Sequence, residues 1–343
     1  MRLALSFLIF FVSSPIFSAP EKGSTAAEKL LQKAWKEIKE KKDTQAFGDF
    51  SAVAKFGNPR GEYGVGYCLA NGFGVSQNFR EALGWCRKSS DHGYGEADLI
   101  LGIFYQNGLG APKDYGKAIF YYEQATLKGC FAGNTYLGMM HERGLGFQKD
   151  YGAAMKCYLK AAEKNHPRAQ FKIGEMYEKG EGVPRDDELA AAWYAKSAGQ
   201  GYPGAEFQMG YFCEKGKGVP QDYSRAADYY QKAADQGDAY SQYNLGLLYK
   251  KGKGVTQDYN KALELFRKAA EAGDDYAQYE LGLMYEKGLG VRRDEKEAEK
   301  WFDAAKKKGN KNAKEALRRM DGNDLFPGWE PGNVLQRMLG KGE

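Results

Sequence analysis

Apolar residues recur along most of this chain at the three- and four-residue spacing of amphipathic helices, in pairs of segments separated by glycine-containing loops. In residues 239–273, one apolar stripe precedes Gly252 and a second follows Asp258. Gly252 is suited to ending the first helix, because glycine accepts the left-handed backbone of a helix C-terminus without a Cβ penalty. Asp258 is suited to starting the second helix, because its carboxylate can accept a hydrogen bond from an unpaired backbone amide. The pattern therefore predicts two helices joined by a capped loop.

This predicted helix pair repeats every 36 residues. A G-x-G occurs in the loop of seven consecutive repeats, at Gly72/Gly74, Gly108/Gly110, Gly144/Gly146, Gly180/Gly182, Gly216/Gly218, Gly252/Gly254 and Gly288/Gly290. The capping position before the second helix holds Asn or Asp in all seven repeats, at Asn78, Asp114, Asp150, Asp186, Asp222, Asp258 and Asp294. A fixed period of this length is the signature of a solenoid. We therefore predict an all-α solenoid of stacked helix pairs, in which capping fully explains the glycine loops.

One position inside the first helix is also glycine in every repeat, although a mid-helix glycine costs about 1 kcal/mol relative to alanine. This column is Gly66, Gly102, Gly138, Gly174, Gly210, Gly246 and Gly282. A matching alanine column in the second helix is Ala82, Ala118, Ala154, Ala190, Ala226, Ala262 and Ala298. We expect the glycine to allow the first helix to pack closely against this alanine. Aromatic pairs such as Trp193/Tyr194 are expected to fill the space between repeats.

The repeat positions divide the chain into five parts. Residues 59–310 contain the seven full repeats, and residues 24–58 match the repeat columns without the G-x-G, which is typical of an N-terminal capping repeat. Residues 311–320 match a first helix only and are predicted to form a C-terminal capping helix. Residues 321–343 form a tail, and residues 1–18 a signal peptide.

The N-terminus has the features of a secretory signal peptide. One arginine precedes a ten-residue apolar run, and small residues follow it. The run is too short to cross a bilayer. Cleavage is expected after Ser18, because cleavage after Ala19 would place the bulky Phe17 at a recognition position. We therefore expect a periplasmic or secreted protein with no integral membrane segment after the signal is removed. The alternative is a cytosolic protein with an uncleaved apolar N-terminus.

Charge and reactive residues give little indication of chemistry. The formal net charge is +5 over 343 residues and both signs are interleaved, so no cationic stripe predicts nucleic-acid binding. The three histidines occupy different repeat positions, and no H-E-x-x-H or C-x-x-C occurs, so neither a metal nor another cofactor is predicted. We expect most cysteines to be buried small residues, with Cys68 and Cys86 as the one pair to test for a disulfide. The five are Cys68, Cys86, Cys130, Cys157 and Cys213.

The consensus A-x-x-x-L-G-x-x-Y-x-x-G-x-G-V-x-x-D-Y-x-K-A-x-x-Y-x-x-K-A-A-x-x-G resembles the Sel-1-like repeat family, which is related to tetratricopeptide repeats. The resemblance covers nearly all of the chain after the signal peptide. It implies a right-handed α/α superhelical solenoid whose first helices line a concave face, and a non-enzymatic adaptor or scaffold role. Two alternatives stay open: an assembly factor for envelope polysaccharide or secretion machinery, and a penicillin-binding or β-lactamase-like hydrolase of the family's cysteine-rich branch. Against the hydrolase, this chain lacks the bridging cysteines of that branch and has no S-x-x-K or K-T-G.

One column of the first helix stays polar and lies beside a largely aromatic column. The members expected to contact a partner are Gln170, Glu206, Phe207, Gln242, Tyr243, Gln278 and Tyr279. Amides and carboxylates beside aromatic rings could hold an extended peptide, a protein segment or a glycan. We therefore predict that these residues form a binding surface on the concave face. The alternative is that the polar column is solvated surface and the rings belong to the core.

Overall fold

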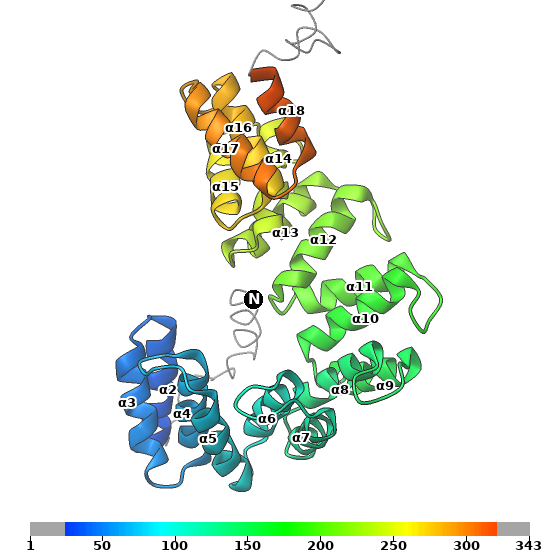
Figure 1. The fold of residues 1–343 in the computed structure, drawn as a ribbon. Coiled ribbons are helices and arrows are strands. Elements are labelled where there is room, and N and C mark those ends of the chain that lie inside the picture. Colours follow the sequence, from blue (N-terminus) through cyan, green and yellow to red (C-terminus); the bar gives the residue numbers. More distant parts are fainter. Residues whose placement is uncertain (1–24, 321–343) are drawn as a thin grey trace, which may run out of the picture. The chain divides into compact units, whose positions relative to one another are not determined.

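The computed structural model describes residues 25–320, which form seventeen α-helices and no strand (Figure 1). In the three repeats of residues 59–166 and the three of residues 203–310, the first helix packs against the second helix of its own repeat, and the predicted all-α solenoid of helix pairs is confirmed. None of the described helices is long and apolar enough to span a bilayer. The predicted signal peptide and tail lie outside the described residues. The helices are α2 (Ala26–Lys39), α3 (Asp43–Ala54), α4 (Pro59–Asn71), α5 (Phe79–Asp91), α6 (Gly95–Asn107), α7 (Tyr115–Leu127), α8 (Ala132–Arg143), α9 (Tyr151–Ala162), α10 (Pro167–Lys179), α11 (Asp187–Ala198), α12 (Pro203–Lys215), α13 (Tyr223–Asp235), α14 (Ala239–Lys251), α15 (Tyr259–Glu271), α16 (Asp275–Lys287), α17 (Glu295–Lys307) and α18 (Lys311–Met320).

The helices divide into two compact units. Unit 1 contains α2–α9 and α10 up to Met176, together with the loop Gly180–Pro184. Unit 2 contains Tyr177–Lys179 and the chain from Arg185 onward, which includes α11–α18. In both units the core lies between successive helices rather than in one central cluster, as expected when each repeat contacts only its neighbours.

The caps are as predicted from the sequence. The seven Asn and Asp residues before the second helices each accept a hydrogen bond from a backbone amide in the first turn, as Asp258 does from Asn260 N (3.0 Å) and Lys261 N (3.1 Å). The first glycine of each G-x-G is the left-handed residue that ends the first helix, with φ of 65° at Gly252. These caps fix where each helix begins and ends.

The second glycine of each G-x-G has a role beyond capping. Gly254 also has a positive φ, and a Cβ placed on it would lie 2.2 Å from the carbonyl carbon of Tyr223, at the start of the preceding repeat's second helix. The equivalent position in the next repeat, Gly290, approaches the backbone of Tyr259 in the same way. The prediction that capping fully explains these loops is therefore wrong, since the second glycine also makes the contact between repeats.

The mid-helix glycines do allow close packing, but their nearest neighbour is not the alanine column. A Cβ on Gly246 would lie 2.7 Å from the ring of Phe266, and one on Gly282 would lie 2.6 Å from the ring of Phe302. These rings are fully buried within their own repeat. In the first repeat the same place is taken by a cysteine, with Cys86 Sγ at 2.7 Å. The nearest neighbour of the glycine is therefore a ring or thiol rather than the predicted alanine, because these side chains extend farther than a methyl group. At Gly66 the alanine column also lies close, with Ala82 O 3.3 Å from the added Cβ.

Additional helices lie on both sides of the seven repeats. The pair α2 and α3 precedes them, with Trp35 packed against the rings of Phe50 (4.9 Å) and Tyr67 (5.1 Å). The single helix α18 follows them and buries Ala313 and Leu317. Both positions coincide with the segments expected to be caps, and the capping role itself stays a prediction.

Candidate protein-binding surface

The predicted polar column lies inside the protein rather than on its surface. The exposed fractions are 4% for Gln170, 3% for Glu206, 6% for Gln242 and 6% for Gln278. The expectation that this column is open to solvent or to a partner is therefore wrong. The column recurs because its side chains make hydrogen bonds inside the fold, and a buried polar group needs such a partner in every repeat.

The glutamines of the polar column donate hydrogen bonds to backbone carbonyls at the C-terminal ends of the second helices. Gln242 Nε2 donates to the carbonyl of Ala234 (3.2 Å), and Gln278 Nε2 donates to that of Ala270 (3.1 Å), each in the preceding repeat. Carbonyls in the last turn of a helix lack intrahelical partners, so an amide donor is stabilising there. The acidic members instead accept from the residue that ends the second helix of their own repeat.

Three acidic members of the column show this second arrangement. Glu206 Oε2 accepts from Gln236 Nε2 at 2.7 Å, and burial raises the pKa of Glu206. In unit 1 the same positions pair Glu62 with His92 (2.7 Å) and Asp98 with Lys128 (2.7 Å). An acid in the column thus faces a donor side chain at the end of a second helix, whereas Gln242 and Gln278 face a backbone carbonyl.

The aromatic neighbours of the column lie at the edge of the core. Phe207, Tyr243 and Tyr279 are each partly buried. Each ring packs on the second helix of its own repeat, as Tyr243 does on Phe266 with ring centroids 5.9 Å apart. Their outer sides contribute to a surface that the sequence analysis did not identify.

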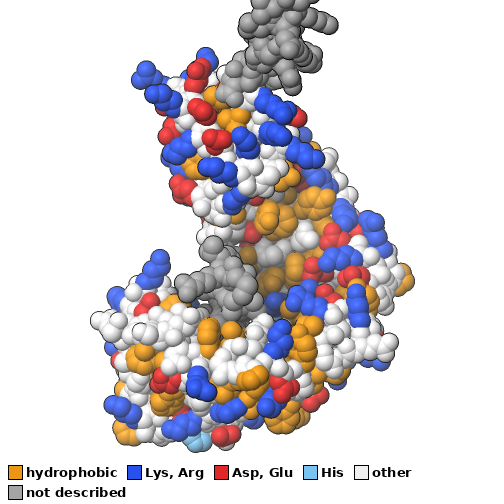
Figure 2. All heavy atoms as spheres, viewed as in Figure 1, with side chains coloured by type: hydrophobic (Ala, Val, Ile, Leu, Met, Phe, Trp, Pro, Cys, Tyr) orange, Lys and Arg blue, Asp and Glu red, His pale blue; other side chains and the backbone are white. Residues whose placement is uncertain are grey.

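This surface, the aromatic stripe, crosses the first helices of unit 2. Tyr240 and Tyr276 are 64% and 56% exposed, and Tyr211 is 38% exposed. Tyr240 and Tyr276 each stand beside a ring of the preceding first helix, with centroids 6.2 Å apart for Phe207 and Tyr240 and 6.0 Å apart for Tyr243 and Tyr276. Figure 2 shows hydrophobic side chains gathered over α12 and the neighbouring part of α14. The full stripe is Phe207, Tyr211, Tyr240, Tyr243, Leu247, Tyr276, Tyr279 and Leu283.

The sequence contained a signal for this stripe. Positions 204, 240 and 276 form one column that reads Gly, Tyr, Tyr, and the tyrosines sit in the first turn of α14 and α16. The prediction of a binding surface on the polar column did not include these two exposed rings.

A charged row borders the stripe near the C-terminal ends of the first helices of unit 2, and its members are Glu178, Glu214, Lys250 and Glu286. In two repeats of unit 2, a buried tyrosine of the second helix donates its hydroxyl to this row: Tyr194 to Glu178 (2.6 Å) and Tyr230 to Glu214 (2.9 Å). The acidic side chains are therefore held by the core below them. Each hydroxyl positions its carboxylate and stabilises the negative charge through a hydrogen bond.

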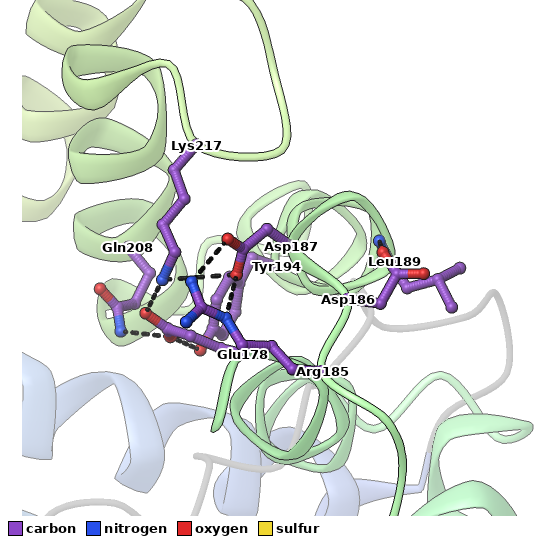
Figure 3. A network of polar contacts seen from close by, with 8 residues as sticks. All are labelled: Glu178, Arg185, Asp186, Asp187, Leu189, Tyr194, Gln208 and Lys217. Atoms are coloured by element: carbon purple, nitrogen blue, oxygen red, sulfur yellow. Dashed lines mark hydrogen bonds and ion pairs between the residues drawn. The ribbon is translucent and has the colours of Figure 1, made fainter. Parts of the chain in front are cut away.

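Figure 3 shows the largest network in the row. Glu178 accepts from Lys217 Nζ (2.8 Å), which belongs to a G-x-G loop, and from Gln208 Nε2 (3.3 Å). Lys217 also pairs with Asp187 (3.5 Å), and Arg185 bonds the same carboxylate (2.9 Å) and lowers its pKa. The side chains come from successive helices and loops of unit 2. Every charge faces an opposite charge or a donor, so the network links repeats and presents no free nucleophile or base.

The row also forms ion pairs between successive repeats, whether the second helix carries phenylalanine or tyrosine. Phe266 has no hydroxyl, and the row residue of its repeat is Lys250, whose Nζ lies 2.6 Å from Glu280 of the next repeat. In unit 1 the equivalent pair has the charges exchanged, with Glu142 3.4 Å from Lys172. These two positions can therefore hold the cation and the anion in either order.

We predict that Lys250→Glu lowers the free energy of unfolding by about 1 kcal/mol, because two carboxylates would face each other in a largely buried site. The double variant K250E/E280K should recover most of the loss. Urea denaturation of the four proteins of this cycle measures the coupling. A double variant as unstable as the sum of the single variants would contradict a direct interaction.

Histidine and cysteine side chains have structural partners in the described residues. His141 stacks on Phe147 with centroids 4.0 Å apart. All five cysteines are free thiols, including Cys68 and Cys86, and burial raises the pKa of Cys86 to about 12. Such thiols are poor nucleophiles at neutral pH. Residues 25–320 contain no group of three or more His, Cys, Asp or Glu placed to hold a metal ion.

The fold defines a helix-pair repeat protein, with an aromatic stripe exposed on the first helices of unit 2. The Sel1 repeat family model matches seven consecutive segments, at residues 59–94, 95–130, 132–166, 167–202, 203–238, 239–274 and 275–310. The chain belongs to the Sel1 repeat family. The fold of this family commonly mediates protein–protein interaction, and its members are typically non-catalytic scaffolds.

Two solved structures show the same architecture. One is a protective antigen present in uropathogenic Escherichia coli strains, described as displaying an SLR fold, with 30% identity and a TM-score of 0.64. That match covers 88% of this chain and 65% of the antigen, so this chain spans less than two thirds of the antigen's length. The other is a Sel1 repeat protein from Oxalobacter formigenes, with 28% identity and a TM-score of 0.63, covering 91% of this chain and 99% of that one. No curated protein matches the chain.

Proposed function

We propose that this protein is an exported, non-enzymatic scaffold that binds a peptide or protein segment on the aromatic stripe of unit 2. The observation that carries the proposal is the exposure of Tyr240 and Tyr276 beside the partly buried rings of Phe207 and Tyr243. Contiguous exposed apolar surface of this kind is uncommon on monomeric proteins and is typical of interaction sites. Tyrosine is enriched where binding energy concentrates, because it offers a large rigid ring with a polar end.

The surroundings of the stripe favour an uncharged, apolar-rich partner segment. The neighbouring charges are already paired within the protein, as in Lys250–Glu280 and Arg319–Glu286 (both 2.6 Å). A partner would therefore gain little from adding a charge here, while apolar or aromatic side chains would bury the tyrosine rings. The hydroxyl groups of Tyr240 and Tyr276 can bond to the partner's backbone.

The test is affinity capture from an envelope extract with the purified full chain as bait. The Y240A/Y276A variant is expected to retain at least tenfold less partner than the wild type, since truncating two interface tyrosines removes about 1–2 kcal/mol each. The matched control is F56A/L127A, which removes two side chains that are 90% and 78% exposed in unit 1 and do not belong to the stripe. Equal recovery by Y240A/Y276A and wild type would exclude the stripe as the binding surface.

A further inference from the structure

The aromatic stripe is built from pairs of neighbouring rings, which we call rungs, and its last rung lacks the second ring. Each of the first two rungs joins a ring to a tyrosine 33 residues later, in the next first helix: Phe207 with Tyr240 and Tyr243 with Tyr276. The third rung starts at Tyr279, and the residue 33 positions later is Asn312, exposed on α18. Tyr279 therefore faces Phe302 of its own repeat (5.7 Å) but no ring from α18.

The apolar columns stop at the same place. The column of Tyr211, Leu247 and Leu283 continues in α18 as Arg319, which pairs with Glu286 at 2.6 Å. The α18 helix thus closes the core of the last repeat, and Tyr279 and Leu283 pack against the cluster that includes Leu317, but α18 offers the outer side of the stripe no aromatic ring. A ring that contacts the outer side of Tyr279 would add an aromatic packing interaction there.

The chain itself supplies two rings directly beyond α18. Residues 321–330 read DGNDLFPGWE and contain Phe326 and Trp329. Asn312 lies eight residues before the end of α18 at Met320, about 12 Å along a helix. Six to nine extended residues can span about 20–30 Å, so both rings can reach the third rung. The Pro-Gly between them favours the turn that a returning chain requires.

Charge also favours this segment as the occupant. Residues 321–330 carry three acidic residues and no basic one. The exposed side of α18 carries Lys311, Lys314 and Arg318. The segment would therefore run beside cations that attract its carboxylates, at an energy that is modest for each exposed pair and adds to the contact of the rings.

We propose that residues 321–330 fold back along α18 and place the aromatic pair Phe326/Trp329 against Tyr279, completing the third rung. The segment thereby occupies the C-terminal end of the stripe as a partner held within the same chain. Its consequence for binding rests on the proposed function: an incoming segment must displace these rings to use Tyr279. The contact itself does not depend on any external partner.

Fluorine NMR of the full chain labelled with 5-fluorotryptophan tests the contact. The chain has five tryptophans, and the Trp329→Phe variant identifies the resonance of Trp329. In the wild type we expect this resonance to be shifted from its position in a free peptide of residues 321–332. Asn312→Tyr supplies from α18 the ring that earlier repeats have, so it should displace the tail and return the resonance to the free-peptide position. The matched control Asn312→Ser should leave it shifted.

A wild-type resonance that coincides with the free peptide would overturn the proposal, as would a shift that Asn312→Tyr leaves unchanged. Both substitutions change an exposed residue, so neither should prevent folding. The result is independent of partner capture through Tyr240 and Tyr276. A failure of the tail contact therefore leaves the proposed function standing, and a failure of capture leaves the tail contact standing.

Discussion

Replacing Gly254 by alanine is expected to destabilise unit 2 by about 2–5 kcal/mol. Gly254 has a φ of +69°, which costs a residue with a Cβ about 1–2 kcal/mol. The new methyl would also lie 2.2 Å from the carbonyl carbon of Tyr223. Backbone atoms cannot rotate away as a side chain can, so the loop and the preceding second helix must separate, which adds an overpacking cost of about 1–3 kcal/mol.

The matched control for Gly254→Ala is Gly237→Ala. Gly237 also has a positive φ (+89°), but no atom lies within 4 Å of its added Cβ. This control isolates the backbone strain and should cost only about 1–2 kcal/mol. Denaturant unfolding gives the difference in stability, and hydrogen exchange in α13–α15 shows whether the loss is local, because repeat arrays need not unfold in one step. Equal losses in the two variants would mean that the second glycine makes no essential contact between repeats.

The elements of this fold that could be predicted from sequence are those with local causes. Asp258 as a cap and Gly252 as a left-handed helix end depend on a few neighbouring residues, and a cause repeated seven times is unambiguous. The contacts between elements were harder to predict. Periodicity indicated that the mid-helix glycines approach something, but it could not distinguish an alanine from a ring on the same helix face, as Gly246 and Phe266 show.

The candidate site shows the same limit more strongly. Gln242 and Gln278 recur at one position whether they contact solvent, a partner or the end of a neighbouring helix, because all three environments accept an amide. Only the structure shows that their Nε2 atoms bond to the carbonyls of Ala234 and Ala270. Conversely, Tyr240 and Tyr276 resemble core residues in composition, and their exposure depends on their rotation around the helix axis, which a single sequence does not fix.

The stability of unit 1 is expected to fall by about 2–3 kcal/mol as the pH decreases from 7 to 4. His166 is partly buried at the start of α10, its Nδ1 lies 2.9 Å from Thr135 Oγ1, and burial together with Arg168 lowers its pKa from 6.5 to about 4. In the unfolded chain the imidazole takes up a proton near pH 6.5, whereas the folded protein resists protonation until about pH 4. The contribution is therefore fully present above pH 6.5 and is lost as the pH falls between these two values.

His166→Asn separates this effect from general acid sensitivity. The same repeat position is occupied by Asn58 and Asn310, whose side chains cap their helices, so asparagine should fit at residue 166. Asparagine does not titrate, and the variant should lose less stability than the wild type between pH 7 and pH 4.5. Urea midpoints measured across this range give the comparison, and His92→Asn is a matched control because His92 is more exposed and accompanies the carboxylate of Glu62. If His166→Asn and the wild type lose stability in parallel, the proton that destabilises unit 1 binds elsewhere.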